Sequence, residues 1–222
     1  GNNTYVYAKN GNFDDAQSEV KKIFTDEEIK EKLKKKNYSL SSANSINIGR
    51  LVPQIVYYFY SYMKLVERNE IVLGEKVNFT VPTGSFGDIL AGYYAELMGL
   101  PVNKLICASN ENNVLYDFIK TGTYDRNRSF YKTLSPSMDI LISSNLERLI
   151  YHLSKNDNKY VKYLMAELKS NGKYTVSQEI KNYIDNLFYA GYTTDLKTSE
   201  TIKNVYNEYN YLLDTHTAVA YN

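Results

Sequence analysis

Hydrophobic and polar residues alternate along the first half of the chain in a pattern that predicts short strands, each followed by a helix. A β-rich run from Thr4 to Ala8 precedes a segment with apolar residues at helical spacing, for which Asp14 is the expected cap. The pattern then predicts two further strand and helix pairs, at 76–81 with 88–99 and at 104–109 with 112–120. Short apolar strands that alternate with helices are typical of a parallel sheet covered by helices, so we expect an α/β fold.

Several further segments have helical patterns. Residues 26–36 carry acidic side chains at the start and basic ones at the end, which matches the dipole of a helix. The run 50–66 is nearly continuously apolar and aromatic, which predicts a largely buried helix with Pro53 in its first turn. Four more helices and few strands are expected at the end of the chain, at 145–153, 159–170, 177–188 and 199–212. The C-terminal third is therefore expected to be helical.

Composition and charge narrow the class of protein. The chain is 43% hydrophobic and 23% charged, and no run approaches the roughly 18 apolar residues of a membrane span, so we expect a soluble protein. A net charge of +1 gives no overall field for nucleic acid or an anionic membrane, and we interpret Lys34–Lys36 as a solvated helix end. The N-terminus has no signal-peptide pattern, so a cytoplasmic location is expected. The single cysteine, Cys107, lies in an apolar run, which predicts burial.

A glycine-bearing turn, Pro82 to Gly87, joins the predicted strand at 76–81 to the helix that follows it. The first amides of a helix have no partner inside the helix, its dipole favours an anion, and glycine lets a ligand approach the backbone closely. In an open α/β sheet, ligand crevices also lie beyond the carboxyl ends of the strands. The turn is therefore a candidate phosphate site. Its spacing matches neither a dinucleotide fingerprint nor a Walker loop, and by spacing alone a plain capping turn is the better explanation.

Five short sequences resemble motifs of threonine synthases and occur in the same order. The phrase from Val81 to Ala95 resembles the loop that binds the cofactor phosphate, whose usual form is Ser-Gly-Asn-Phe-Gly-Asp. The other four are Gly11–Asp15, Ser42–Leu51 with its Asn-Ser-Ile-Asn signature, Ser135–Ile140 together with Ser144–Arg148, and His216–Ala220. They span almost the whole chain, which therefore resembles the middle of a threonine synthase.

The resemblance implies a pyridoxal-phosphate enzyme of the tryptophan-synthase-β-like fold, fold type II, that converts O-phosphohomoserine and water to threonine and phosphate. It implies three parts, which are the small subdomain and the helix after it (1–75), the cofactor-phosphate part of the large domain (76–142) and a mainly helical segment (143–222). The residues expected to hold the cofactor phosphate, mainly by backbone amides, are Gly84, Ser85, Phe86, Gly87 and Asp88. Ser85 replaces the usual asparagine, which leaves a side-chain contact at this position in doubt.

Other residues of these motifs are weaker candidates for the substrate side of the crevice. They are Asn44, Ser45, Asn47, Arg50 and Arg148. A hydrogen-bonded loop that caps the following helix explains the first four equally well. For Arg148, and for Ser137, Asp139 and Asn145, a structural network is the preferred interpretation, although the planar guanidinium of Arg148 is also suited to bidentate capture of a substrate phosphate.

The sequence lacks two motifs of the family. Neither the Phe-Lys-Asp motif, whose lysine forms the Schiff base, nor the Thr-Ser-Gly-Asp-Thr-Gly loop, which holds the substrate carboxylate, occurs in it. The chain also ends at Asn222, before the family's C-terminal segment. We therefore expect an internal fragment that has no catalytic residue, is inactive alone, and binds pyridoxal phosphate weakly or not at all. His152 and His216 have no partner at metal-ligand spacing, so we expect neither a metal site nor a general base.

Two other functions fit the same residues. A threonine-synthase-like phospholyase would use the same phosphate loop but release a keto acid instead of threonine. A non-catalytic α/β module would use the turn from Thr83 to Asp88 to bind a phosphate or a protein. The oligomeric state is left open by the sequence.

Overall fold

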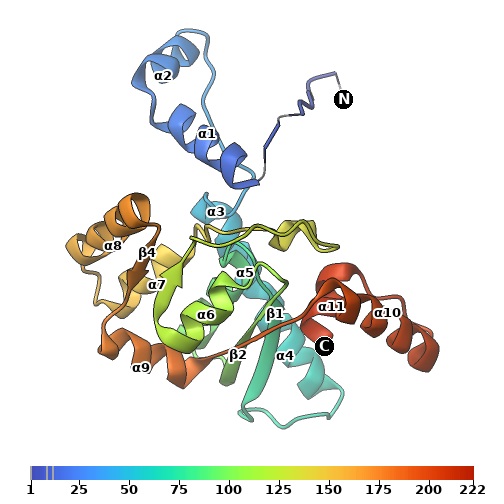
Figure 1. Cartoon of the computed structure of the whole chain (residues 1–222). Helices are drawn as coiled ribbons and strands as arrows, with labels where there is room; N and C mark the ends of the chain where they lie inside the picture. Colours follow the sequence, from blue (N-terminus) through green and yellow to red (C-terminus); the bar gives the residue numbers. More distant parts are fainter. Residues whose placement is uncertain (1, 9, 12) are drawn as a thin grey trace. The chain divides into compact units, whose positions relative to one another are not determined.

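The N-terminal unit, Gly1–Ser42, holds two short helices, α1 (Phe13–Thr25) and α2 (Glu27–Lys34), in a computed structural model that describes residues 2–8, 10–11 and 13–222 (Figure 1). The strand expected at Thr4–Ala8 is absent from this described part, because a strand needs a hydrogen-bonded neighbour and these residues have none. Asp14 lies in the first turn of α1 and is not its cap. The helix expected at 26–36 is α2, and Asp26 is its N-cap, whose Oδ1 accepts from the amide of Ile29 at 3.0 Å.

The second unit, Ala43–Asn222, is built on a parallel sheet of three strands. The strands lie in the order β1 (Val77–Pro82), β2 (Val102–Ser109) and β5 (Phe188–Tyr192). Helix α5 (Gly87–Leu97) connects β1 to β2, and the two strands pair in parallel, which confirms the predicted α/β fold. The two strands of the sheet that the sequence predicts are therefore β1 and β2.

Strand β5 was not predicted. Its sequence, Phe-Tyr-Ala-Gly-Tyr, follows helix α9 (Gln178–Leu187) with no glycine or proline between them, so the amphipathic pattern of the helix continues through Phe188. Phe188 and Ala190 are buried while Tyr189 between them is exposed, which is the alternation of a half-buried strand. The short pair β3 (Thr123–Asp125) and β4 (Lys173–Thr175) is antiparallel and was also missed.

Most of the other helices of the second unit fall in predicted helical segments, η2 and α11 being the exceptions, and the last third is mainly helical. Their bounds are α3 (Ile48–Leu51), η1 (Val52–Gln54), α4 (Ile55–Glu67), α6 (Val114–Thr121), η2 (Pro136–Met138), α7 (Leu146–Leu153), α8 (Asn158–Asn171), α10 (Asp195–Tyr209) and α11 (Thr215–Tyr221). The seven-residue helix α11 was not predicted. Seven residues are too few to show a clear helical pattern, and no clear turn signal precedes the N-cap, Asp214.

The sheet has a different core on each face. Leu105 and Cys107 of β2 belong to the main core, which also includes buried residues of α5, α6 and α9. Ala108 points to the opposite face and forms a small separate cluster with Met138 and Val219 of α11. Cys107 is free and fully buried, as predicted, and burial raises the pKa of its thiol to about 12. Helix α11 therefore packs at the carboxyl end of the strands, on the face away from α5.

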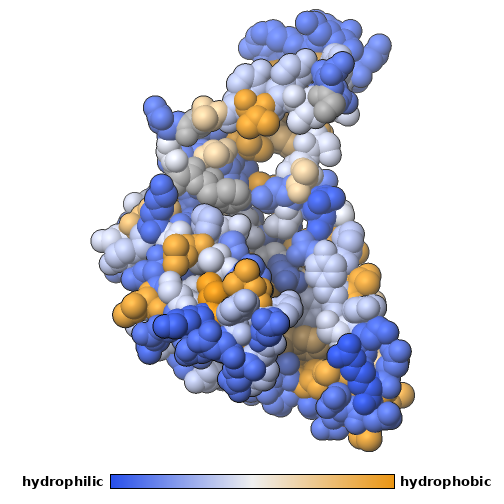
Figure 2. Space-filling view, turned by 90° about the vertical axis from the view of Figure 1, so that its right-hand side faces the viewer, coloured by the Kyte–Doolittle hydropathy of each residue, from blue (hydrophilic) through white to orange (hydrophobic). Residues whose placement is uncertain are grey.

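The prediction of a largely buried helix at 50–66 is wrong. Pro53 lies in the short 3-10 turn η1, which separates α3 from α4, and only Tyr58 and Tyr62 of α4 are buried. Exposed residues of α4 include Val56, Tyr57, Tyr60 and Met63. Their exposure follows because α4 packs by one face on α5, which leaves the other face to solvent. The face of the molecule in Figure 2 shows separate hydrophobic patches among hydrophilic residues. Within the described residues, no helix has both the length and the apolar composition that crossing a membrane requires.

Candidate functional site

The loop between β1 and α5 begins with a fixed turn and contains one strained residue. The amide of Thr83 donates to the carbonyl of Ala108 at 2.8 Å, which extends the ladder between β1 and β2 by one residue. Phe86 then precedes α5 with φ of 64° and ψ of 17°, a left-handed conformation that a bulky side chain rarely adopts. Its side chain is 1% exposed and packs against the ring of Phe188, with centroids 5.8 Å apart. Core packing therefore holds a backbone conformation that is unfavourable on its own.

Two carbonyl groups of the loop accept hydrogen bonds from Ser143 and Asn145. Ser143 Oγ donates to the carbonyl of Gly84 at 2.6 Å, and both the amide and the side chain of Asn145 donate to the carbonyl of Ser85, at 3.0 and 3.1 Å. In a trans peptide, the N–H of the next residue points opposite to the carbonyl. The amides of Ser85 and Phe86 therefore point away from Ser143 and Asn145.

These amides border a cavity of about 290 Å3 at the carboxyl end of β1. Among the described residues, none accepts a hydrogen bond from the backbone N–H of Ser85, Phe86 or Gly87. The amide of Gly87 begins α5, whose dipole places partial positive charge at the same point. Free amides, a helix N-terminus and a cavity beyond a strand end together fit a phosphate group.

Glycine is required at two positions of the loop because neighbouring groups come very close. A Cβ at Gly84 would lie 2.9 Å from the carbonyl oxygen of Ser137 and 3.0 Å from the Cα of Met138. A Cβ at Gly87 would lie 2.9 Å from Ser45 Oγ. The loop is therefore enclosed by two walls, one at Ser137–Met138 and one at Ser45.

Arg148 and Asn145 of the α7 region hold the wall at Ser45. Asn145 Nδ2 donates to Ser45 Oγ at 2.9 Å, and the guanidinium of Arg148 donates to the carbonyls of Ser45 and Ile46 at 2.8 and 2.7 Å. It also contacts Asn145 Oδ1. Arg148 does not line the cavity, so the structure places it in a network that positions Ser45. Its capture of a substrate phosphate stays a prediction.

Of the other weak candidates, only Ser45 reaches the cavity. Asn44 Oδ1 accepts from the amide of Ile46 at 3.0 Å, and Asn47 Oδ1 accepts from the amide of Gly49 at 3.0 Å and caps α3. Arg50 is exposed on α3. These contacts agree with the alternative interpretation, a loop that caps the following helix.

A buried polar network supports the wall at Ser137. The carboxylate of Asp139 is 5% exposed and accepts hydrogen bonds from Asn110, Asn112 and Thr133 at 2.7–3.1 Å. Asn110 and Asn112 directly follow β2, so the network ties the loop before Asp139 to the carboxyl end of the sheet. Sequence reasoning missed both asparagines, although polar residues directly after a buried strand are a usable signal.

Asp88 is an acidic group on the cavity. Its Oδ1 is buried and has no hydrogen-bond partner among the described residues, and burial raises the pKa of its carboxyl group. Tyr58 donates to the backbone carbonyl of Asp88 at 2.8 Å, and burial raises the pKa of this phenol as well. Among the described residues, no group of three His, Cys, Asp or Glu side chains is arranged to hold a metal.

His216 also lines this cavity, which the sequence did not lead us to expect. Its Nδ1 lies 3.4 Å from Asp214 Oδ1, and its Nε2 accepts from the amide of Ser137 at 3.3 Å. We expected no partner at metal-ligand spacing for this histidine, and did not foresee that Asp214 would lie beside its ring. Asp214 caps α11, so the Asp-x-His pattern at a helix start is the signal that would have found the pair.

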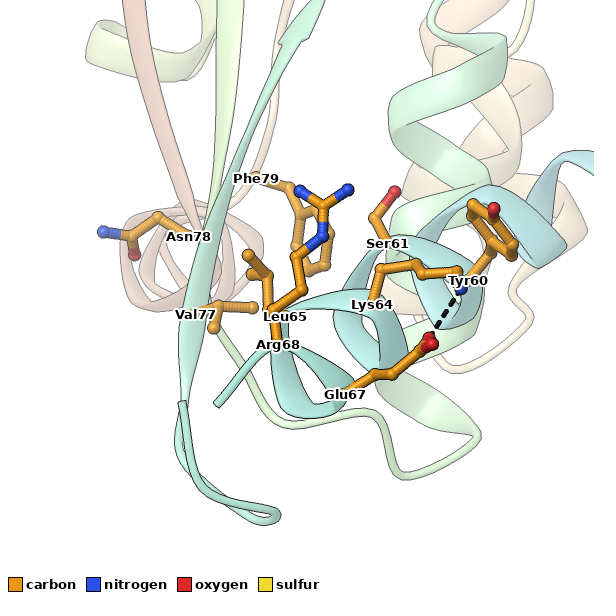
Figure 3. Close-up of a pocket in the computed structure, with 9 residues that line it drawn as sticks. All are labelled: Tyr60, Ser61, Lys64, Leu65, Glu67, Arg68, Val77, Asn78 and Phe79. Atoms are coloured by element: carbon orange, nitrogen blue, oxygen red, sulfur yellow. Dashed lines mark hydrogen bonds and ion pairs between the residues drawn. The ribbon is translucent and has the colours of Figure 1, made fainter. Parts of the chain in front are cut away.

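A groove of about 690 Å3, larger than the cavity at the loop, runs along the outer edge of β1 (Figure 3). It is lined by Tyr60, Ser61, Lys64, Leu65, Glu67, Arg68, Val77, Asn78 and Phe79. Lys64 and Glu67 pair with each other at 2.5 Å, as the dashed line in Figure 3 marks. The groove contains no helix N-terminus and none of the loop residues, so its size alone does not make it the site.

Comparison with known proteins gives a consistent result. Models of known protein families give no match. The chain is 41% identical to threonine synthase of Saccharomyces cerevisiae over 98% of its length, and 42% identical to that of Pseudomonas aeruginosa over 99%. It is 42% identical to human threonine synthase-like 1 over 98% of its length. It spans 43%, 44% and 30% of these relatives, respectively.

Solved structures agree with the sequence comparison. The structure of pyridoxal-phosphate-bound threonine synthase from Brucella melitensis matches with a TM-score of 0.83 and 43% identity, over 96% of this chain and 43% of that one. Yeast threonine synthase matches with a TM-score of 0.79 and 42% identity, over 95% of this chain and 42% of that one. The fold is thus that of part of a fold-type II pyridoxal-phosphate enzyme. Within that class, the chain is homologous to part of a threonine synthase.

Proposed function

We propose that this chain holds the cofactor phosphate of a pyridoxal-phosphate enzyme, and that the whole protein converts O-phosphohomoserine and water to threonine and phosphate. The observation that carries the proposal is the orientation of the loop. The carbonyls of Gly84 and Ser85 accept hydrogen bonds from Ser143 and Asn145, so the amides of Ser85 and Phe86 point away from those two residues and border the cavity. Similarity to threonine synthases over nearly the whole chain supports the choice of reaction.

The loop would bind the phosphate without a cationic side chain. Among the described residues that line the cavity, none is a lysine or an arginine, so the amides of Ser85, Phe86 and Gly87 and the dipole of α5 would carry the attraction. The packing of Phe86 against Phe188 would keep these amides in place before the ligand arrives. A site that is already arranged loses little free energy in ordering itself around an anion.

Pyridoxal phosphate, when bound, supplies the electron sink that lets protons leave carbon and phosphate leave the substrate. The side chains of this chain would orient and enclose that chemistry. The hydroxyl of Ser45 and the amide of Gln54 line the same cavity and are the proposed polar contacts on the substrate side. Arg148 and Asn145 would act through Ser45, by holding its carbonyl and hydroxyl in position.

We propose further that this chain is inactive by itself. It contains neither a Phe-Lys-Asp nor a Thr-Ser-Gly-Asp-Thr-Gly sequence, so it has no lysine in the position expected to anchor the cofactor covalently. It should also bind pyridoxal phosphate weakly, through the phosphate alone.

The experiment is a phosphate-release assay with O-phosphohomoserine, run in parallel on this chain and on the complete protein with pyridoxal phosphate added. We expect release and threonine formation by the complete protein, and neither by this chain. Turnover by this chain would overturn its proposed inactivity. Failure of the complete protein to consume the substrate would overturn the proposed reaction.

Two alternatives are separated by the same assay. The identities to threonine synthases and to a threonine synthase-like protein are equal within a few per cent, so similarity does not choose between them. A keto acid as product, in place of threonine, would indicate a phospholyase. A complete protein that shows no visible absorbance from covalently bound pyridoxal phosphate would indicate a non-catalytic phosphate-binding module.

A further inference from the structure

The phosphate cavity contains one basic side chain among its described lining residues, and this is His216 of α11. The helix is fixed against the carboxyl end of the sheet, because Val219 packs with Met138 and Ala108 in a buried cluster. The ring of His216 therefore belongs to a packed wall of the cavity that the start of α5 also lines.

The two ring nitrogens of His216 have different partners. Nε2 accepts from the amide of Ser137 at 3.3 Å, which requires this nitrogen to be unprotonated. Nδ1 lies 3.4 Å from Asp214 Oδ1, so the single proton of the neutral ring belongs there. Asp214 also accepts from the amides of His216 and Thr217, and its hydrogen bond with the Thr217 hydroxyl is the main cause that lowers the pKa of its carboxyl group. Asp214 is thus ionised, and it can stabilise a charged imidazole.

The bond from Ser137 links the ring to the phosphate loop. The carbonyl of Ser137 and the Cα of Met138 lie so close to Gly84 that a Cβ there would be 2.9–3.0 Å from them. A proton on Nε2 would break the bond from the Ser137 amide, since both groups would then be donors. An anion bound between Nε2–H and the Ser137 amide would accept a hydrogen bond from each, and so replace the bond between them.

We infer that His216 takes up a proton when an anion enters this cavity, and that its Nε2–H and the Ser137 amide then both donate to the anion. This inference rests on the proposed function, because it assumes that the loop is a phosphate site. It adds a side-chain cation to a site that is otherwise made of amides. It also makes anion binding depend on pH.

The other titratable groups near the ring are few. On its own element, Asp214 faces Nδ1. From α5, Asp88 lines the same cavity, and its protonation would also favour an anion at lower pH. Helix α10 packs on α11, and its Tyr209 interacts with Tyr221 at the opposite end of α11 from His216. A test must therefore separate His216 from Asp88.

The test measures sulfate affinity of this chain by calorimetry between about pH 5.5 and 8, because sulfate does not titrate in this range. For the unmodified chain, affinity should rise as the pH falls, by up to about tenfold per pH unit, the limit for uptake of one proton. In His216→Gln the amide side chain can still accept from Ser137, so binding should persist at about pH 8 but lose most of its rise toward low pH. His152→Gln, the matched change at the chain's other histidine, should keep the full rise.

The variant Asp88→Asn should keep the pH dependence if His216 is its source, and an equal slope in His216→Gln and the unmodified chain would overturn the inference. Loss of binding in His216→Gln at every pH would also overturn it, because the ring would then only hold the wall. A direct readout is the His216 Cε1–H resonance, whose chemical shift at a fixed pH should move toward that of a protonated imidazole when sulfate saturates the site. No sulfate binding by any variant would overturn both this inference and the proposed phosphate loop.

Discussion

Two of the hollows that strand β1 borders differ in almost every property that a ligand would detect. The groove along its edge has a volume of about 690 Å3, while the cavity at its carboxyl end has about 290 Å3. The groove is lined by side chains of α4 and β1, among which Lys64 and Glu67 pair with each other and Arg68 adds a further positive charge. The smaller cavity is lined by backbone amides of the loop, whose carbonyls accept hydrogen bonds from Ser143 and Asn145.

From this difference we infer that the direction of the backbone amides, and not the volume of a hollow, decides where this chain would bind an anion. The carboxyl end of β1 leads into the N-terminus of α5. Phe86, between them, has an unfavourable left-handed backbone conformation that orients the neighbouring amides. Along the edge, none of the residues that line the groove has a positive φ. Changes to the cavity should therefore affect both folding and binding, and changes to the groove should affect neither strongly.

The largest effect is expected for Gly84→Ala. The new Cβ would meet backbone atoms of Ser137 and Met138 that cannot move aside as a flexible side chain can, so the loop must shift. We expect a loss of about 1–3 kcal/mol in the free energy of unfolding and at least about tenfold weaker sulfate binding. Gly191→Ala in β5 is the control, because a Cβ there meets nothing within 4 Å. Chemical denaturation and calorimetry measure both quantities, and equal behaviour of the two variants would contradict the close packing of the loop.

Arg148→Gln should have the next largest effect. The variant leaves the carbonyls of Ser45 and Ile46 without their charged donor, which should cost about 1–3 kcal/mol of stability. Because Arg148 does not line the cavity, sulfate affinity of the folded variant should change little. Kinetics of the complete protein distinguish two roles for Arg148. If Arg148 only positions Ser45, the KM for O-phosphohomoserine should change modestly, whereas direct capture of the substrate phosphate by Arg148 predicts a large change of KM.

Asp88→Asn tests the acidic group of the cavity through pH. Burial raises the pKa of Asp88 above its ordinary value of 3.8, so the folded chain binds this proton more tightly than the unfolded chain does. Stability therefore falls as the pH rises through the folded-state pKa, and the penalty persists at neutral pH. The variant should be more stable than the unmodified chain at about pH 7, and the gap should close below about pH 4. A less stable variant at pH 7 would mean that the α5 dipole favours the charge more than burial opposes it.

The alternation of strands and helices predicted much of this arrangement. It located β1, α5, β2 and α6, and the rule that crevices lie beyond strand ends located the loop. Strand β5 was missed because an amphipathic helix runs directly into it, and helix α4 was predicted to be buried because an apolar pattern does not reveal whether a neighbour is present. His216 was missed for a different reason: it lies 132 positions after Gly84, and no local pattern predicts that α11 packs beside that loop.

The smallest effect is expected for Lys64→Ala, which tests the groove side of the comparison. The Lys64–Glu67 pair is solvent-exposed on α4, with side chains 41% and 65% exposed, so its loss should change the free energy of unfolding by less than about 0.5 kcal/mol. Its charge lies in the groove and not at the loop, so sulfate affinity should be unchanged at a fixed ionic strength. Calorimetry on the same preparation measures this directly. Sulfate binding that weakens clearly in Lys64→Ala, while Gly84→Ala still binds, would place the anion in the groove and reverse the assignment of the two hollows.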